Sequence, residues 1–177
     1  MGTRINILFS HNLSAWNDRN SVLEILRSTD AVCERINNYF GQGDLAWVAK
    51  AEFPVPETRD YHRYVGTLFV EVNPTSVRIR SAARWLGFVT IPELREVHVT
   101  AFYDFVRAFD ASEARCFPDQ DDAVGAFWDG ATFSGCCEIL DRTYGRPRLL
   151  TDQLDPDFAE QDRVSRTLAQ YSLTRQK

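Results

Sequence analysis

The order of its apolar patterns constrains this chain more than any other sequence feature. A short β-branched run, Ile5 to Phe9, comes first and is typical of a buried strand. Apolar residues at helical spacing follow from Ser21 to Phe40, and three strand-like segments come next. A second helical stretch, a further strand and more helices complete the order. Because strands and helices do not alternate strictly, the pattern argues against a doubly wound parallel sheet.

The strand-like segments suggest a hairpin near the middle of the chain. Leu45 to Phe53 and Tyr64 to Val72 are rich in β-branched and aromatic residues, and each is predicted to be one strand. Asn73-Pro74-Thr75-Ser76 has the composition of a turn. Val77 to Arg80 alternates apolar with basic residues, which predicts a return strand with one face in solvent. Ala114 to Phe117 is predicted to be a further short strand.

Helix boundaries are marked by capping residues. Ser21 with Glu24 predicts a capping box at the start of the first helix, and Thr90 with Glu93 offers one for the long helix from Pro92 to Phe109. Three further helices are predicted, from Asp121 to Trp128, from Phe133 to Tyr144, and from Asp155 to about Tyr171.

These elements predict an α+β fold for a single globular domain spanning residues 1–177. Its sheet is expected to be mostly antiparallel, with about five strands packed against several helices. The chain of 177 residues is long enough to bury a core without disulfides or metals. It contains no run of about 20 apolar residues, so no membrane association is expected.

The overall charge limits the partners. A formal net charge of −5 lacks the basic surplus that nucleic-acid binding requires, so no nucleic-acid partner is expected. The amino-terminal residues do not resemble a signal peptide, which predicts a cytoplasmic location. The four cysteines show no metal-binding spacing and are expected to be free thiols, and no metal site is predicted. The chain lacks phosphate-binding glycine loops, so no cofactor is expected.

A weak catalytic pattern lies at the end of the first strand. Ser10-His11-Asn12 follows an apolar strand, and Asp18 could orient His11 while Ser10 serves as nucleophile. This arrangement would make the protein a small hydrolase or transferase. No serine lies in a nucleophile-elbow motif, so the plainer interpretation is a polar residue at a strand end, and no catalytic residue is assigned.

Acidic residues cluster in the carboxyl-terminal third. Residues 111 to 141 contain seven acids and one base, and the acids alternate with large aromatic residues. In one interpretation, these acids cap helices and lie on a helix face exposed to solvent. In the other, a recognition surface attracts a basic protein through charge and binds it through an aromatic anchor. The predicted partner-binding residues are Asp119, Asp121, Asp122, Trp128 and Asp129.

The preferred hypothesis is a non-enzymatic cytoplasmic protein that binds a basic protein partner. In size and charge the chain is similar to bacterial immunity proteins that neutralise toxins, although it carries no family motif. A scaffold or oligomer subunit is a further alternative, and the sequence leaves the oligomeric state open. Arg78, Arg80 and Arg84 could hold an anionic ligand, but an outward-facing strand already explains them.

Overall fold

The computed structural model describes residues 3–13, 16–49, 61–119, 121–150 and 170–174. Eight strands form one sheet in the order β2-β3-β4-β5-β1-β6-β8-β7. All neighbouring strands are antiparallel except β7 and β8, which are parallel. The strands are β1 (Arg4–Ser10), β2 (Val48–Ala49), β3 (Tyr61–Val65), β4 (Leu68–Val72), β5 (Ser76–Arg84), β6 (Glu113–Pro118), β7 (Arg148–Leu149) and β8 (Tyr171–Thr174).

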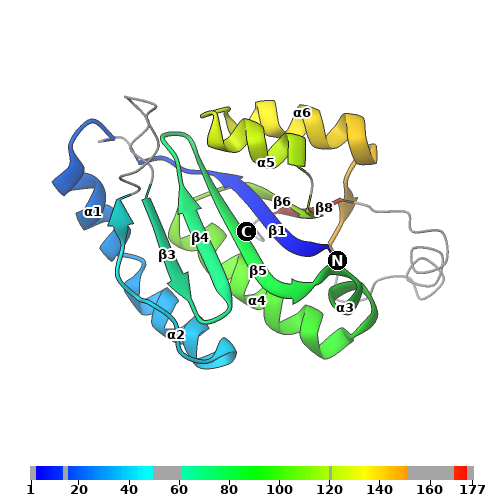
Figure 1. Ribbon diagram of the computed structural model, residues 1–177, viewed down its shortest axis with the longest axis horizontal. Coiled ribbons are helices and arrows are strands. Elements are labelled where there is room, and N and C mark those ends of the chain that lie inside the picture. The colour runs from blue at the N-terminus through cyan, green and yellow to red at the C-terminus, as the bar shows by residue number, and fades with distance from the viewer. Residues whose placement is uncertain (1–2, 14–15, 50–60, 120, 151–169, 175–177) are drawn as a thin grey trace.

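Helices lie on both faces of this sheet (Figure 1). One face packs against α1 (Arg19–Arg27), α2 (Asp30–Phe40), α3 (Trp85–Thr90) and α4 (Pro92–Ala108), and the other against α5 (Asp121–Trp128) and α6 (Phe133–Tyr144). In the described part of the chain, no helix is long and apolar enough to cross a membrane.

Side chains alternate between the two faces along the central strand β1. Ile5, Ile7 and Phe9 point into the larger core beneath α1 to α4, whereas Leu8 joins Phe117 in the smaller core beneath α5 and α6. The short pair of helices therefore covers the part of its face near β1 and β6, and the end of α5 reaches β4 and β5 through Trp128. Among the described residues, no helix covers the same face of β3 (Figure 1).

The prediction of mixed helices and strands is confirmed, but the predicted number of about five strands is wrong. The observed sheet has eight strands and is mixed. One missed strand arises because Tyr64 to Val72 is not a single strand. Gly66, with φ of 58°, and Thr67 form a two-residue turn between β3 and β4, with Val65 opposite Leu68. The apolar run on both sides conceals this turn in the sequence.

Helix boundaries also differ from prediction. Asp18, not Ser21, caps α1, and its carboxylate accepts hydrogen bonds from the backbone N–H groups of Asn20 and Ser21. The predicted helix from Ser21 to Phe40 is two helices, because the hydroxyls of Ser28 and Thr29 donate to carbonyls one turn back and end the first.

The boundaries of the later elements agree with prediction only in part. The cap of α4 is Ile91, which makes no side-chain cap bond, so the capping box of Thr90 and Glu93 does not form. The bounds of α5 and α6 agree with prediction. The predicted helix from Asp155 falls mostly outside the described residues, but Tyr171 lies in β8 and not in a helix. Of the predicted strand from Leu45 to Phe53, the structure describes only Val48–Ala49 as a strand.

Candidate functional site

Trp128, the last residue of α5, is the most exposed large aromatic residue of its helix pair. Its side chain is 50% exposed, yet contacts with strands β4 and β5 hold it in position. The indole N–H donates a hydrogen bond to Oε1 of Glu71 on β4 at 3.2 Å. The guanidinium carbon of Arg78 on β5 lies 5.5 Å from the centre of the indole ring, a cation–π contact. The ring is thus held in one orientation while one side stays in solvent.

Glu71 and Arg78 form a buried ion pair beneath this indole. Their side chains are 3% and 5% exposed, and the register of β4 and β5 places the two residues directly opposite each other. Nε and Nη2 of Arg78 also donate to Oδ1 of Asn6 on β1, at 3.2 and 2.9 Å. Burial lowers the pKa of the Arg78 guanidinium, and the neighbouring Glu71 carboxylate opposes that shift. The prediction that this face of β5 is wet is therefore wrong at Arg78.

The carboxyl end of α5 is fixed by its own backbone and by the β4–β5 turn. Gly130, with φ of 84°, donates its N–H to the Phe127 carbonyl, and Ala131 donates to Ala126, which is the Schellman arrangement. The side-chain amide of Asn73 donates to the same Phe127 carbonyl at 2.9 Å. These bonds place Trp128 over β4 and β5.

The predicted acidic residues have different environments. Asp119 is 30% exposed on its side chain, and its carboxylate accepts from the backbone N–H of Arg4 and from the Asn6 amide, at 2.9 and 2.8 Å. The side chain of Asp121 lies outside the described residues. Asp122 and Asp129 are exposed. They are seven residues apart, about 10 Å along one side of α5.

Asp129 does not fit the helix-capping interpretation. It lies at the carboxyl end of α5, where the helix dipole is negative and a carboxylate is disfavoured. Asp122, in the first turn, does fit it. The aromatic residues near these acids also differ in exposure. Phe117 and Phe127 are buried in the smaller core, and Phe133 is partly buried against it. Trp128 and Asp129 are therefore two neighbouring exposed residues whose exposure neither helix capping nor core packing explains.

His11 is held by backbone groups on both ring nitrogens. The N–H of Leu13 donates to Nδ1 at 3.1 Å, which places the ring proton on Nε2, and Nε2 donates to the Asn73 carbonyl at 2.7 Å. Burial lowers the pKa of His11. With both nitrogens bonded to the backbone, the ring supports a structural role at the end of β1 and offers no nitrogen to Ser10 or Asp18.

His98 and the four cysteines are likewise buried. His98 on α4 donates from Nδ1 to the Leu94 carbonyl at 2.7 Å and contacts the Ser81 hydroxyl through Nε2 at 2.8 Å, and burial lowers its pKa. All four cysteines are free and buried, as predicted, and burial raises the pKa of Cys136 to about 11 and of Cys137 to about 12. Within the described ranges, no cluster of three or more potential ligands could hold a metal ion.

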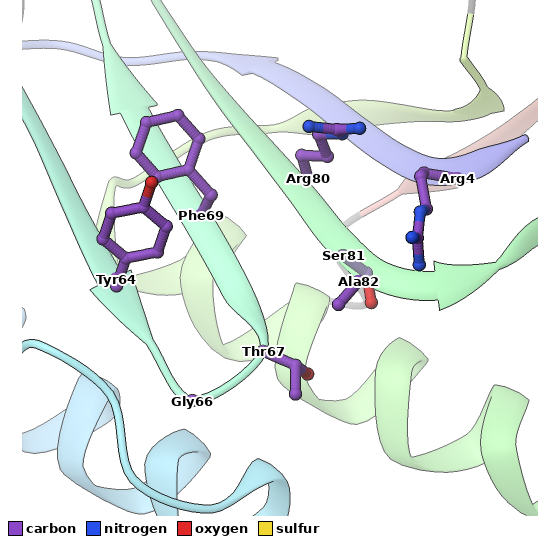
Figure 2. A pocket seen from close by; sticks show the side chains of 8 residues that line it. All are labelled: Arg4, Tyr64, Gly66, Thr67, Phe69, Arg80, Ser81 and Ala82. Carbon is purple, nitrogen blue, oxygen red and sulfur yellow. The ribbon is translucent and has the colours of Figure 1, made fainter.

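A shallow hollow of about 400 Å³ lies beside this site on the uncovered part of the sheet (Figure 2). Tyr64 and Phe69 stand along one side, and Arg80 and Arg4 stand along the other. Of the predicted arginine cluster, Arg80 and Arg84 are exposed and Arg78 is buried.

Sequence reasoning missed the groups that hold Trp128 in place. Glu71 is the one acid within the apolar run of β4, and it faces Arg78 across the β4–β5 hairpin on a face that the sequence pattern predicted to be in solvent. Asn73 was recognised only as a turn residue, whereas its amide also reaches α5.

We compared the chain with models of protein families, with curated proteins and with solved structures, and nothing matched. The functional argument therefore rests on the geometry.

Proposed function

We propose that this protein works by binding a basic protein, using the surface formed by Trp128, Asp129 and Asp122. The observation that carries the proposal is the state of Trp128, which is half exposed and yet held by a hydrogen bond to Glu71 and a cation–π contact with Arg78. An aromatic side chain ordered before binding loses little conformational entropy when a partner covers it. Tryptophan is also among the residues that contribute most binding energy at interfaces.

The charges near this anchor suit a cationic partner. Asp122 and Asp129 are exposed along one side of α5, and Asp129 stands where the helix dipole makes a carboxylate unfavourable. Exposed carboxylates raise the rate at which a basic protein reaches the surface, and the indole then supplies buried contact area. A protein that neutralises its partner in this way covers the partner's surface without chemistry, as an immunity protein would cover a toxin.

The two remaining predicted residues take other parts in this proposal. Asp119 supports the surface indirectly, because it holds Asn6, which in turn holds Arg78. Asp121 begins α5, and its side chain lies outside the described residues. The surface is thus centred on the carboxyl end of α5, not on its beginning.

The test compares capture of partners by matched variants. The native protein, immobilised, is exposed to extract of cells in which it naturally occurs, and the bound proteins are quantified. Trp128→Ala is compared with Tyr39→Ala, because Tyr39 is equally exposed at 52% on α2 beneath the opposite face. Asp122→Lys with Asp129→Lys is compared with Glu24→Lys with Glu34→Lys, which changes the charge equally on α1 and α2.

We expect a captured basic protein to be lost with the α5 variants and retained with the controls, and to dissociate more readily as salt is raised. Circular dichroism establishes that each variant is folded. If every captured protein binds the α5 variants and the controls equally, the proposed surface is wrong.

A further inference from the structure

The hollow on the uncovered sheet face is created by strand register. Tyr64 on β3 lies opposite Phe69 on β4, and Phe69 lies opposite Arg80 on β5. Because opposite residues project from the same face, the three side chains form a row across the sheet, with neighbouring strands about 4.8 Å apart. The rings of Tyr64 and Phe69 stack with centroids 4.6 Å apart and 27° between their planes, and Tyr64 is 50% exposed.

Small residues create the space next to this row. Ala82 lies two residues beyond Arg80 on the same face of β5, and its exposed methyl group forms part of the floor. Gly66 and Thr67, the turn between β3 and β4, close the lower side (Figure 2). The result is a hollow with an aromatic side, a cationic side and a small-residue floor.

The charge of the hollow is positive although the protein is acidic. Arg4 and Arg80 line it, and Arg84 lies opposite Arg4 in the register of β1 and β5. The nearest described acid in contact with them is Asp119, 3.8 Å from Nε of Arg80. Its carboxylate already accepts hydrogen bonds from Asn6 and from the Arg4 backbone. The two guanidinium groups that line the hollow, against one carboxylate that is already hydrogen-bonded, favour an anion.

We propose that this hollow binds a nucleoside monophosphate. Its base would stack on a free ring face of the stacked Tyr64–Phe69 pair, since every base presents a flat face to an aromatic side chain. Its phosphate would accept hydrogen bonds from Arg80 and Arg4, whose planar guanidinium groups suit phosphate oxygens. Here the arginine side chains replace the glycine loop that the sequence lacks.

A free nucleotide fits the hollow better than a long single strand does. The volume of about 400 Å³ is within the range of pockets for single small molecules. The aromatic residues form one stacked pair, which gives one place for one base. The net charge of −5 and the exposed acids on α5 repel an extended polyanion.

The experiment measures binding of adenosine 5′-monophosphate to the full chain by isothermal titration calorimetry. Adenosine lacks the phosphate, inorganic phosphate lacks the ring, and a uridine decamer provides the single strand. We expect the nucleotide to bind at least about tenfold more tightly than adenosine or phosphate, because only the nucleotide uses both sides of the hollow. The decamer should bind no more tightly than the nucleotide.

Three variants locate the site. Ala82→Leu fills the floor with an exposed side chain and should weaken nucleotide binding at least about tenfold without loss of folding. Arg80→Gln should weaken binding of the nucleotide and leave binding of adenosine unchanged. Arg107→Gln, which removes an exposed charge from α4 that, like Arg80, lies 3.8 Å from a carboxylate oxygen, is the control and should have no effect.

Failure of the native protein to bind the nucleotide at millimolar concentration overturns the proposal, as does binding that Ala82→Leu leaves unchanged. Tighter binding of the decamer would identify a single strand as the occupant and also overturn it. None of these substitutions changes Trp128, Asp122 or Asp129, so the result is independent of the proposed protein-binding surface.

Discussion

Substitution of Glu71 by glutamine tests the buried network that holds Trp128. The change preserves the shape of the side chain but removes the carboxylate paired with the Arg78 guanidinium, whose side chain is 5% exposed. Removing one partner of a buried ion pair costs about 3–5 kcal/mol, because the other charge stays desolvated. The glutamine oxygen still accepts from Arg78, and Asn6 continues to accept from it twice. We therefore expect the lower end, a loss of about 3 kcal/mol.

This loss is large relative to the stability of a typical domain, about 5–15 kcal/mol. The free energy of unfolding is measured by urea denaturation followed by far-ultraviolet circular dichroism. For a chain of this length, the thermal midpoint should fall by roughly 6–12 °C. A double variant, Glu71→Gln with Arg78→Met, removes the orphaned charge and should recover part of the loss.

The double variant distinguishes the buried charge from general disruption. If the double variant is less stable than Glu71→Gln alone, or if the single change costs under about 1 kcal/mol, then the pair does not act as a desolvated charge couple. The fluorescence of the native state supplies a second readout, because the indole of Trp128 loses a charged hydrogen-bond acceptor.

Four other outcomes are expected. Asp129→Asn relieves the unfavourable charge at the helix end and should raise stability by about 0.3–1 kcal/mol in urea denaturation, while weakening partner capture; a loss of stability would contradict the dipole argument. Gly130→Ala should cost about 1 kcal/mol in the same assay, because alanine disfavours the positive φ. Burial lowers the pKa values of His11 and His98, so on acidification the unfolded chain binds protons before the native protein does. The contribution of the two histidines to the free energy of unfolding should be fully present above about pH 6.5 and should fall below that pH, by at most about 1.4 kcal/mol per pH unit for each histidine. An unfolding midpoint that does not change between pH 5 and 7 would count against this. The four thiols should react with Ellman's reagent only after unfolding, because burial raises their pKa values and excludes the reagent; rapid reaction of the native protein would refute this.

Local patterns predicted the helices on the smaller core well. The bounds of α5 and α6 were predictable because each helix has an apolar face and a recognisable end, such as the glycine that follows Trp128 and Asp129. The hairpin of β4 and β5 followed from the turn at Asn73 and the alternation after it. Each of these features depends on residues close together in the sequence.

Features that depend on distant residues were not predictable. The strands β7 and β8, which were not predicted, contain only two and four residues, too few for a periodic pattern. Arg78 alternates with apolar residues as a solvent-facing residue would, but it is buried against Glu71, Asn6 and Trp128. Trp128 lies fifty residues later in the sequence. The candidate site was therefore recognised at the exposed ring but not at the groups that orient it.

The place of β1 in the sheet sets the order in which the molecule can assemble. This strand lies early in the sequence, yet it is flanked by β5 and β6, which come about 70 and 110 residues later. One edge of β1 therefore stays unpaired until β5 has been synthesised, and the other until β6, which ends at Pro118, has been synthesised. Closing such long loops slows folding. A fragment that ends before β6 would expose one edge of its central strand, so we expect such fragments to aggregate instead of folding as a stable half.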